Sequence, residues 1–378
     1  MMKKVNILNV LILLIVSTSV LKAQNTTQKY SIMPVPQNFK NFQKLEQFKK
    51  DFEVLKKDAF DLRKLLPSNY KTDGSVDYTK YIQDGLNKYS KVLFPNFPIQ
   101  INDSGLHPRS NTVLLFPEKS ELILKPSKKD RYELIKLHDV NNVSIYFPKI
   151  DGNRNRHLGQ DGEWGYGISI YSSKRIRIYN PVVENCWGDG ICISQLERSQ
   201  PSEDVEIYYP IINNNRRNGI TIASARNLTI ERPIISNTFG ISPMAAIDIE
   251  PASQYYILEN ITLESPLTYH SRYGIILALT QLSGKHAQPV SITINNHLDI
   301  YSAIGFRVAK FREIYKQNPP IKGEIHINNP RWEKSNMQGI QLEQTFNLAP
   351  HIYFSGKNAQ VQNALKALKA NRIFYKEK

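Results

Sequence analysis

A short phrase that recurs through much of the chain constrains the fold more than any other feature of the sequence. Each copy opens on a small residue, continues as apolar–x–apolar, and is followed by a polar link, a second apolar run and, in most copies, a proline. The opening residues are Gly167, Gly190, Gly219, Ala246, Gly274, Gly305 and Gly339. Their spacing of 23 to 34 residues is in the range at which repeats indicate a solenoid or an array of stacked units.

The apolar runs inside each repeat have the period of β-strands. Alternation with period two, as in Ile191-x-Ile193 and Ile247-x-Ile249, indicates short strands. No helical pattern separates the strands, which argues against helical and leucine-rich repeats. An antiparallel sandwich is the alternative, but the hairpin turns that it needs are mostly missing. We therefore predict an all-β, right-handed parallel β-helix whose coils stack and share one core, with capping helices at both ends.

The two ends of the chain carry other patterns. Lys3 and Lys4 precede an apolar stretch and then small or polar residues up to Ala23, as in a secretory signal peptide. The apolar stretch is shorter than the ~20 residues that span a bilayer, so we expect a secreted or periplasmic protein with no membrane span after cleavage. The predicted parts are a signal peptide (1–23), an N-terminal helical extension (24–72), the β-helix (73–357) and a C-terminal capping helix (358–378).

Residues 41–66 have apolar positions that recur every three or four residues, which predicts a helix. We expect this helix to pack on the end of the solenoid. A helix that binds a partner or a membrane surface is the alternative.

Composition narrows the classes of function. The net charge is +15 with a sequence pI near 9.5, a balance typical of proteins that bind nucleic acid, membrane surfaces or acidic polymers. For an exported β-helix we expect an anionic polysaccharide and no nucleic acid. Cys186 and Cys192 are predicted to pack as buried thiols rather than to form a disulfide. The sequence has no metal-type His/Cys cluster and no phosphate loop, so we predict no cofactor and no metal.

Two carboxylates stand out once the repeats are stacked in register. The residues between and after the paired isoleucines point outward, and most of them are small or neutral. Asp248 and Glu250 are predicted to lie together on one exposed face, with Asp189 two coils away. Glycosidic bond hydrolysis uses a pair of carboxyl groups, and crowding raises the pKa of one of them. We predict Asp248 and Glu250 as acid and base, with Asp189 assisting, and the alternative is a set of solvated surface acids balanced by Arg307.

Basic and aromatic residues on the turns beside this strand are candidates for holding a long polymer. Arginines would bind acidic groups, and indole rings would stack on sugars. The predicted substrate-binding residues are Arg216, Arg217, Arg272, Arg307, Trp164 and Trp187.

Several segments resemble the pectin-lyase-like β-helix superfamily. Residues 73–102, which begin DGSVDYTKYIQDGL, are similar to the opening of such proteins, where a short capping helix precedes the first coil. The resemblance implies a helix capped by Asp77 that buries Tyr81, Ile82 and Leu86. Trp187-Gly188-Asp189-Gly190 resembles the N-T-D-G strand entry of polygalacturonase-type hydrolases, which implies a catalytic role for Asp189. The Asp-Asp and Gly-His-Gly motifs of that family have no counterpart in this sequence.

Three functions remain open at this point. The leading prediction is an exported glycoside hydrolase that cleaves an acidic polysaccharide. A polysaccharide lyase or epimerase acting on uronic-acid polymers would use the same acids to hold Ca²⁺, which needs six to eight oxygen ligands. A non-catalytic glycan-binding or structural β-helix would bind without Asp248 and Glu250.

Overall fold

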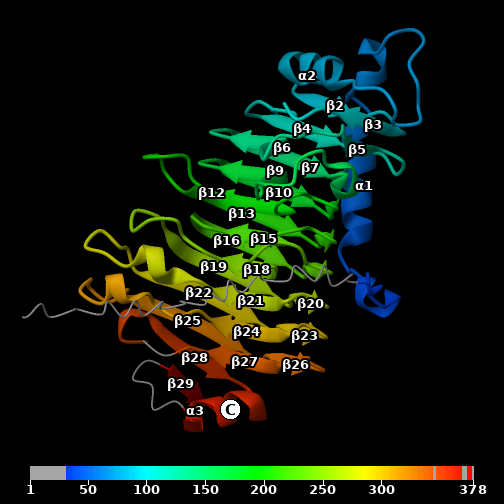
Figure 1. Cartoon of the computed structure of the whole chain (residues 1–378). Helices are drawn as coiled ribbons and strands as arrows, with labels where there is room; N and C mark the ends of the chain where they lie inside the picture. Colours follow the sequence, from blue (N-terminus) through cyan, green and yellow to red (C-terminus); the bar gives the residue numbers. More distant parts are fainter. Residues whose placement is uncertain (1–30, 344–345, 368–372, 377–378) are drawn as a thin grey trace, which may run out of the picture. The chain divides into compact units, whose positions relative to one another are not determined.

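The computed structural model describes residues 31–343, 346–367 and 373–376. The predicted signal peptide lies outside these residues. The described residues from Ile32 onward belong to one compact unit, in which three parallel sheets run along a stack of coils (Figure 1). Every strand pair is parallel and joins one coil to the next, so the predicted parallel β-helix is confirmed.

Each coil contributes one strand to each sheet through most of the stack. Sheet A contains β1 (Phe60–Asp61), β2 (Lys91–Leu93), β4 (Thr112–Leu115), β7 (Asn141–Tyr146), β10 (Lys174–Tyr179), β13 (Ser202–Tyr208), β16 (Ala225–Glu231), β19 (Leu258–Glu264), β22 (Val290–Asn295), β25 (Gly323–Asn328), β28 (His351–Ser355) and β29 (Ile373–Lys376). Sheet B contains β3 (Pro98–Ile101), β5 (Glu121–Leu124), β8 (Lys149–Asp151), β11 (Val182–Glu184), β14 (Ile211–Asn213), β17 (Ile234–Ser236), β20 (Leu267–Tyr269), β23 (Leu298–Ile300) and β26 (Arg331–Glu333). Sheet C contains β6 (Arg131–His138), β9 (Trp164–Tyr171), β12 (Ile191–Ser194), β15 (Ile220–Ile222), β18 (Ala245–Ile249), β21 (Tyr273–Leu277), β24 (Ile304–Val308) and β27 (Gln338–Leu342).

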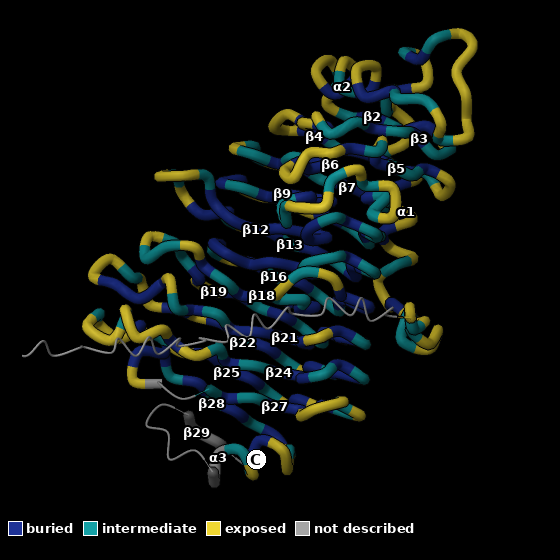
Figure 2. Tube along the Cα trace, viewed as in Figure 1, coloured by how far each residue is buried: buried dark blue, intermediate teal, exposed yellow. Residues whose placement is uncertain are grey.

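Sheet C is built from the apolar–x–apolar phrases, in the register that the sequence predicts. Cys192 pairs with Thr221, Thr221 with Asp248, and Asp248 with Ile276. The flanking isoleucines point inward and are fully buried, which gives each coil its share of the continuous core (Figure 2). The opening residue is small because space there is short: a Cβ at Gly219 would lie 2.2 Å from Cγ2 of Ile235.

Helices cover both ends of the core. α2 (Thr79–Lys88) buries Ile82 and Leu86 at the N-terminal end, and Asp77 accepts a hydrogen bond from the Thr79 backbone nitrogen at 3.0 Å. The prediction for Tyr81 is wrong: Tyr81 is 37% exposed, because its position on the helix turns it away from the coils. At the other end α3 (Ala359–Ala367) places Val361 in the core. Residues 373–376 extend sheet A as β29 instead of continuing a helix.

The helix predicted within residues 41–66 is α1 (Leu45–Lys56), and it lies along the side of the coils rather than at their end (Figure 1). Phe48 packs against Tyr179 of one coil and against Tyr208 and Tyr209 of the next. These outward tyrosines form an apolar column that the helix covers, while the end of the core is already occupied by α2. Both cysteines are buried free thiols, as predicted.

A buried polar cluster interrupts the apolar core beneath sheet B. The inward position held by Ile235 in one coil is held by Thr268, then Asp299, then Trp332 in the next three. Oδ1 of Asp299 accepts hydrogen bonds from the Thr268 and Ser302 hydroxyls, each at 2.6 Å. Oδ2 of Asp299 has no hydrogen-bond partner within the described part of the chain. Burial raises the pKa of Asp299 to about 7, against the opposing effect of these hydrogen bonds.

This carboxyl group predicts a pH-dependent stability. Because the folded-state pKa of Asp299 lies above its unfolded value, the folded protein loses stability as the pH rises from about 4 to about 7. Asp299→Asn removes that loss. The free energy of unfolding of the variant minus that of the parent protein should therefore rise by about 2–3 kcal/mol between pH 5 and pH 8. Denaturant unfolding at the two pH values measures this, with Asp84→Asn on the exposed face of α2 as control. A difference between variant and parent that does not change with pH would show that Asp299 is ionised over this whole pH range.

Candidate functional site

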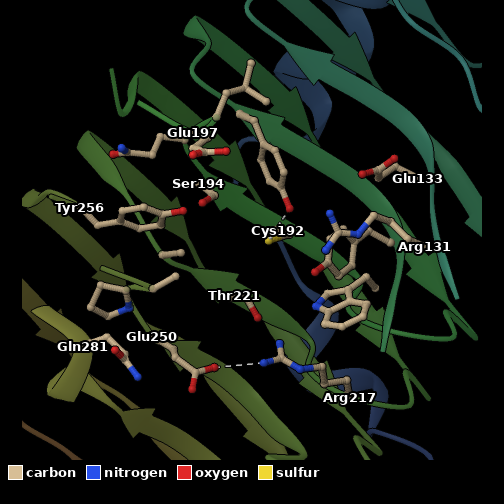
Figure 3. A pocket seen from close by; sticks show the side chains of 18 residues that line it. Arg131, Glu133, Cys192, Ser194, Glu197, Arg217, Thr221, Glu250, Tyr256 and Gln281 are labelled. Atoms are coloured by element: carbon tan, nitrogen blue, oxygen red, sulfur yellow. Dashed lines mark hydrogen bonds and ion pairs between the residues drawn. The ribbon is translucent and has the colours of Figure 1, made fainter. Parts of the chain in front are cut away.

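A cavity of about 580 Å³ lies on the outer face of sheet C (Figure 3). Its floor is formed by outward side chains of β6, β9, β12 and β15, such as Cys192 and Thr221. Its walls come from the links that follow β12, β18 and β21, which contribute Glu197, Tyr256 and Gln281. Four aromatic side chains line the cavity: Trp164, Tyr166, Tyr171 and Tyr256.

The predicted carboxylate pair lies at the edge of this cavity, but only one member reaches it. Glu250 lines the cavity with a side chain that is 40% exposed. Asp248 is fully buried, which contradicts its predicted exposure. Its outward side chain stands between those of Thr221 and Ile276 in neighbouring coils, and the Asn218 side-chain amide donates to its Oδ2 at 2.9 Å. Close stacking of coils thus covers an outward position that the strand pattern alone would leave open.

The surroundings of Asp248 favour its protonated form. Burial and then the negative charge of Glu250 raise the pKa of Asp248 well above its usual range, and the nearby Arg217 charge opposes this shift. Oδ1 of Asp248 accepts no hydrogen bond from any described residue, while the two carboxyl side chains are hydrogen-bond neighbours. A proton shared between Asp248 and Glu250 would satisfy that oxygen. The prediction that crowding raises one pKa is confirmed, with burial as the larger cause.

Arg217 connects the carboxylates beside the cavity. Its guanidinium lies 3.0 Å from Asp189, 3.0 Å from Glu250 and 3.5 Å from Glu163. Asp189 is fully buried and accepts further hydrogen bonds from the Thr221 hydroxyl at 2.7 Å and the Asn218 backbone nitrogen at 3.1 Å. Burial raises the pKa of Asp189, and the Arg217 charge and these hydrogen bonds oppose the shift. Asp189 therefore orients Arg217 from below and does not line the cavity.

The other predicted binding residues separate into two groups. Trp164 lines the cavity, with the Arg131 guanidinium 4.9 Å from the centre of its ring. Trp187 does not: it stacks on His157 at 3.9 Å, with the Arg216 guanidinium 3.9 Å from its ring centre. The other two predicted arginines also lie outside the cavity lining, because Arg272 lies over Tyr273 and Arg307 pairs with Glu343.

Sequence reasoning missed several residues of the cavity. Arg131 and Glu133 lie on β6, whose Ile135 pairs with Ile168 of the next coil. This coil has Leu134 where later coils have the opening glycine, so a search for the full phrase starts one coil too late. The alternation Ile135-x-Leu137 was a usable signal. Glu197 and Tyr256 lie in links without periodicity, where no comparable signal exists.

Two further features bear on the chemistry. The described residues contain no group of three His, Cys, Asp or Glu side chains placed to share a metal ion. No helix among them is long and apolar enough to span a membrane.

Comparisons with known proteins agree with this architecture. The family model described as "Right handed beta helix region" matches residues 119–262. An uncharacterized SPbeta prophage-derived protein of Bacillus subtilis, YorA, is 27% identical over 162 residues, which cover 39% of this chain and 28% of that protein. The three parallel sheets of stacked coils and this match agree in giving the chain a right-handed parallel β-helix fold.

Solved structures of low sequence identity share the fold. The pre-mature bacteriophage phi29 gene product 12 superposes with a TM-score of 0.58 at 15% identity, over 82% of this chain and 47% of that one. An iota-carrageenase complexed to iota-carrageenan fragments gives 0.53 at 13% identity, over 67% and 57%. The family 28 exopolygalacturonase of Yersinia enterocolitica gives 0.52 at 12%, over 84% and 68%. The chain thus spans under a third of its curated relative and about half of the phage protein. At these identities the similarity establishes the fold alone.

Proposed function

We propose that this protein binds a polysaccharide in the cavity over sheet C and hydrolyses its glycosidic bonds, with Glu250 as the carboxyl group that meets the substrate. The observation that carries the proposal is the pairing of partly exposed Glu250 with fully buried Asp248, whose pKa is raised, at the edge of an aromatic-lined cavity. Glycoside hydrolases use carboxyl groups in this way, one of them with a raised pKa. Two β-helix proteins of the same fold are, by their names, a carrageenase and a polygalacturonase.

The roles follow from which groups can reach a bound sugar. Glu250 is the general acid: the proton shared by Asp248 and Glu250 passes through the Glu250 carboxyl group to the glycosidic oxygen as the bond to the anomeric carbon breaks, and solvent restores that proton after water has attacked the anomeric carbon and released its own. Arg217, held by Asp189, fixes the position of the Glu250 carboxylate. Glu133 lines the far side of the cavity (Figure 3), on β6, four coils from β18 in sheet C, and at ~4.8 Å per coil it lies too far from Glu250 to act on the same glycosidic bond.

The site of action is part of the proposal. Residues 1–23 carry lysines near the start, then an apolar stretch, and then small or polar residues. This order is typical of secretory signal peptides. We propose that the mature protein works outside the cytoplasm, where long polysaccharides are found.

A panel of polysaccharides tests the reaction. The purified protein is incubated with acidic and neutral polymers, with and without EDTA, and new reducing ends and unsaturated uronate absorbance are both measured. We expect reducing ends without unsaturated product, in amounts that EDTA does not change. Unsaturated product that requires Ca²⁺ would identify a lyase instead. Binding to a polymer of the panel without any cleavage would indicate a glycan-binding protein. The ion pair between Glu250 and Arg217 is compatible with that function as well.

A further inference from the structure

We infer that the sugar unit bound beside Glu250 is electrically neutral, although the chain as a whole is strongly basic. The inference relies on the proposed function only in placing a glycan in the cavity. It differs from the sequence-based expectation of an anionic polymer, which came from a net charge of +15. The argument concerns where that charge lies.

The cations at the cavity are few, and the central one is already neutralised. Among the residues that line the cavity, Arg131 and Arg217 are the two with a basic side chain. Arg217 is 13% exposed and contacts three carboxylates within 3.5 Å. An acidic sugar beside Glu250 would have to displace those partners, and one of them, Asp189, is fully buried and cannot move to solvent.

Acidic side chains outnumber basic ones on the cavity wall. Glu133, Glu197 and Glu250 all line it. Glu133 is paired with Lys136 at 3.2 Å, and Glu197 is 3.7 Å from Arg198. A carboxylate or sulfate next to Glu250 would therefore meet like charges without an unpaired cation to compensate for lost hydration.

The positive charge predicted to bind substrate lies elsewhere. Arg216 stacks on Trp187 and donates to the Gly162 backbone oxygen. Arg307 is committed to Glu343 and the Tyr273 hydroxyl. Among the lining cations in the described part of the chain, Arg131 is the one without a carboxylate within ion-pair distance. Any acidic substituent is thus confined to the wall formed by Arg131 and Trp164, away from Glu250.

The remaining lining groups suit an uncharged sugar. Trp164 and Tyr256 offer ring faces on which the apolar face of a pyranose can pack. The Tyr166, Ser194 and Gln195 side chains supply neutral hydrogen-bonding groups for hydroxyls. Such sites bind through shape and hydrogen bonding, so their affinity depends little on salt.

Matched polymers that differ only in charge test the inference. Binding of the intact protein to polygalacturonate and alginate is compared with binding to the carboxyl-reduced, neutral form of each, by affinity electrophoresis at low and high NaCl. Neutral soluble glucan, xylan and galactan are run alongside. We expect neutral polymers to bind at least tenfold more tightly than acidic ones, with less than a twofold change on adding salt. Arg131→Gln is tested on the acidic polymers, and Arg175→Gln on sheet A, the control, should leave neutral binding unchanged.

Tighter binding of the acidic member of a pair, weakened by salt and by Arg131→Gln, would overturn the inference. Binding by no polymer in the panel would also count against it. Neutral binding without cleavage would leave this inference standing while removing the proposed hydrolysis, so the two can fail separately.

Discussion

Glu250→Gln lowers the rate of glycosidic bond cleavage by about 10²–10⁴-fold, the range that a positioned acid or base contributes, while the protein remains folded. Glutamine keeps the size of the side chain and an oxygen that can accept from Arg217, but it cannot transfer a proton. The same change removes the negative charge that helps to raise the pKa of Asp248. Initial rates of reducing-end formation, on whichever polymer the panel identifies, measure the effect.

Glu343→Gln is the matched control. Glu343 holds the equivalent outward position three coils further along sheet C, but it pairs with Arg307 and lies outside the cavity lining. The turnover of this variant should stay within about twofold of that of the parent protein.

Asp248→Asn tests the buried carboxyl group separately from Glu250, which meets the substrate. This change should alter the alkaline limb of the pH–rate profile more than the affinity for substrate. Equal activity of the Glu250→Gln variant and the parent would remove Glu250 from the mechanism.

Arg217→Met lowers the free energy of unfolding by about 3–5 kcal/mol, the cost of breaking a buried ion pair by removing one partner. The change leaves Asp189 fully buried without its cation. It also removes the charge that opposes protonation of Asp189 and Asp248. Both carboxyl groups should then hold their protons to higher pH, so the stability deficit should shrink as the pH falls. Denaturant unfolding at several pH values measures the deficit.

A second substitution separates charge from packing in this prediction. Asp189→Asn in the Arg217→Met background removes the unpaired carboxylate, keeps the acceptor for the Thr221 hydroxyl, and should recover about half or more of the lost stability. Arg175→Met, on the exposed face of sheet A, controls for the new side chain. A deficit that is the same at every pH and is not recovered by Asp189→Asn would mean that Arg217 acts by packing alone.

The parallel coils were predictable because their determinants are local and repeated. Each phrase carries its own inward isoleucines, and a one-residue slip would turn them all outward. The predicted pairing of Thr221 with Asp248 therefore holds in the structure. The position of α1 was less accessible, since the column of Tyr179, Tyr208 and Tyr209 that it covers appears only when the coils are stacked.

The candidate site was predictable only in part. Strand alternation identifies Asp248 and Glu250 as outward, but it does not say which outward side chains neighbouring coils cover. Asp248 is buried by Ile276 and Asn218, which are distant in sequence. Net charge has a similar limit as a predictor of the site: it sums over the whole surface, whereas Arg216 and Arg307 are engaged outside the cavity.

A crystal structure of the Glu250→Gln variant with a bound oligosaccharide tests the central claim most directly. We predict a sugar chain over sheet C, with a glycosidic oxygen within hydrogen-bond distance of the residue 250 side chain and a ring packed on Trp164 or Tyr256. An oligosaccharide bound on another face of the coils, with the cavity filled by solvent, would contradict the assignment of this cavity as the site of glycan cleavage.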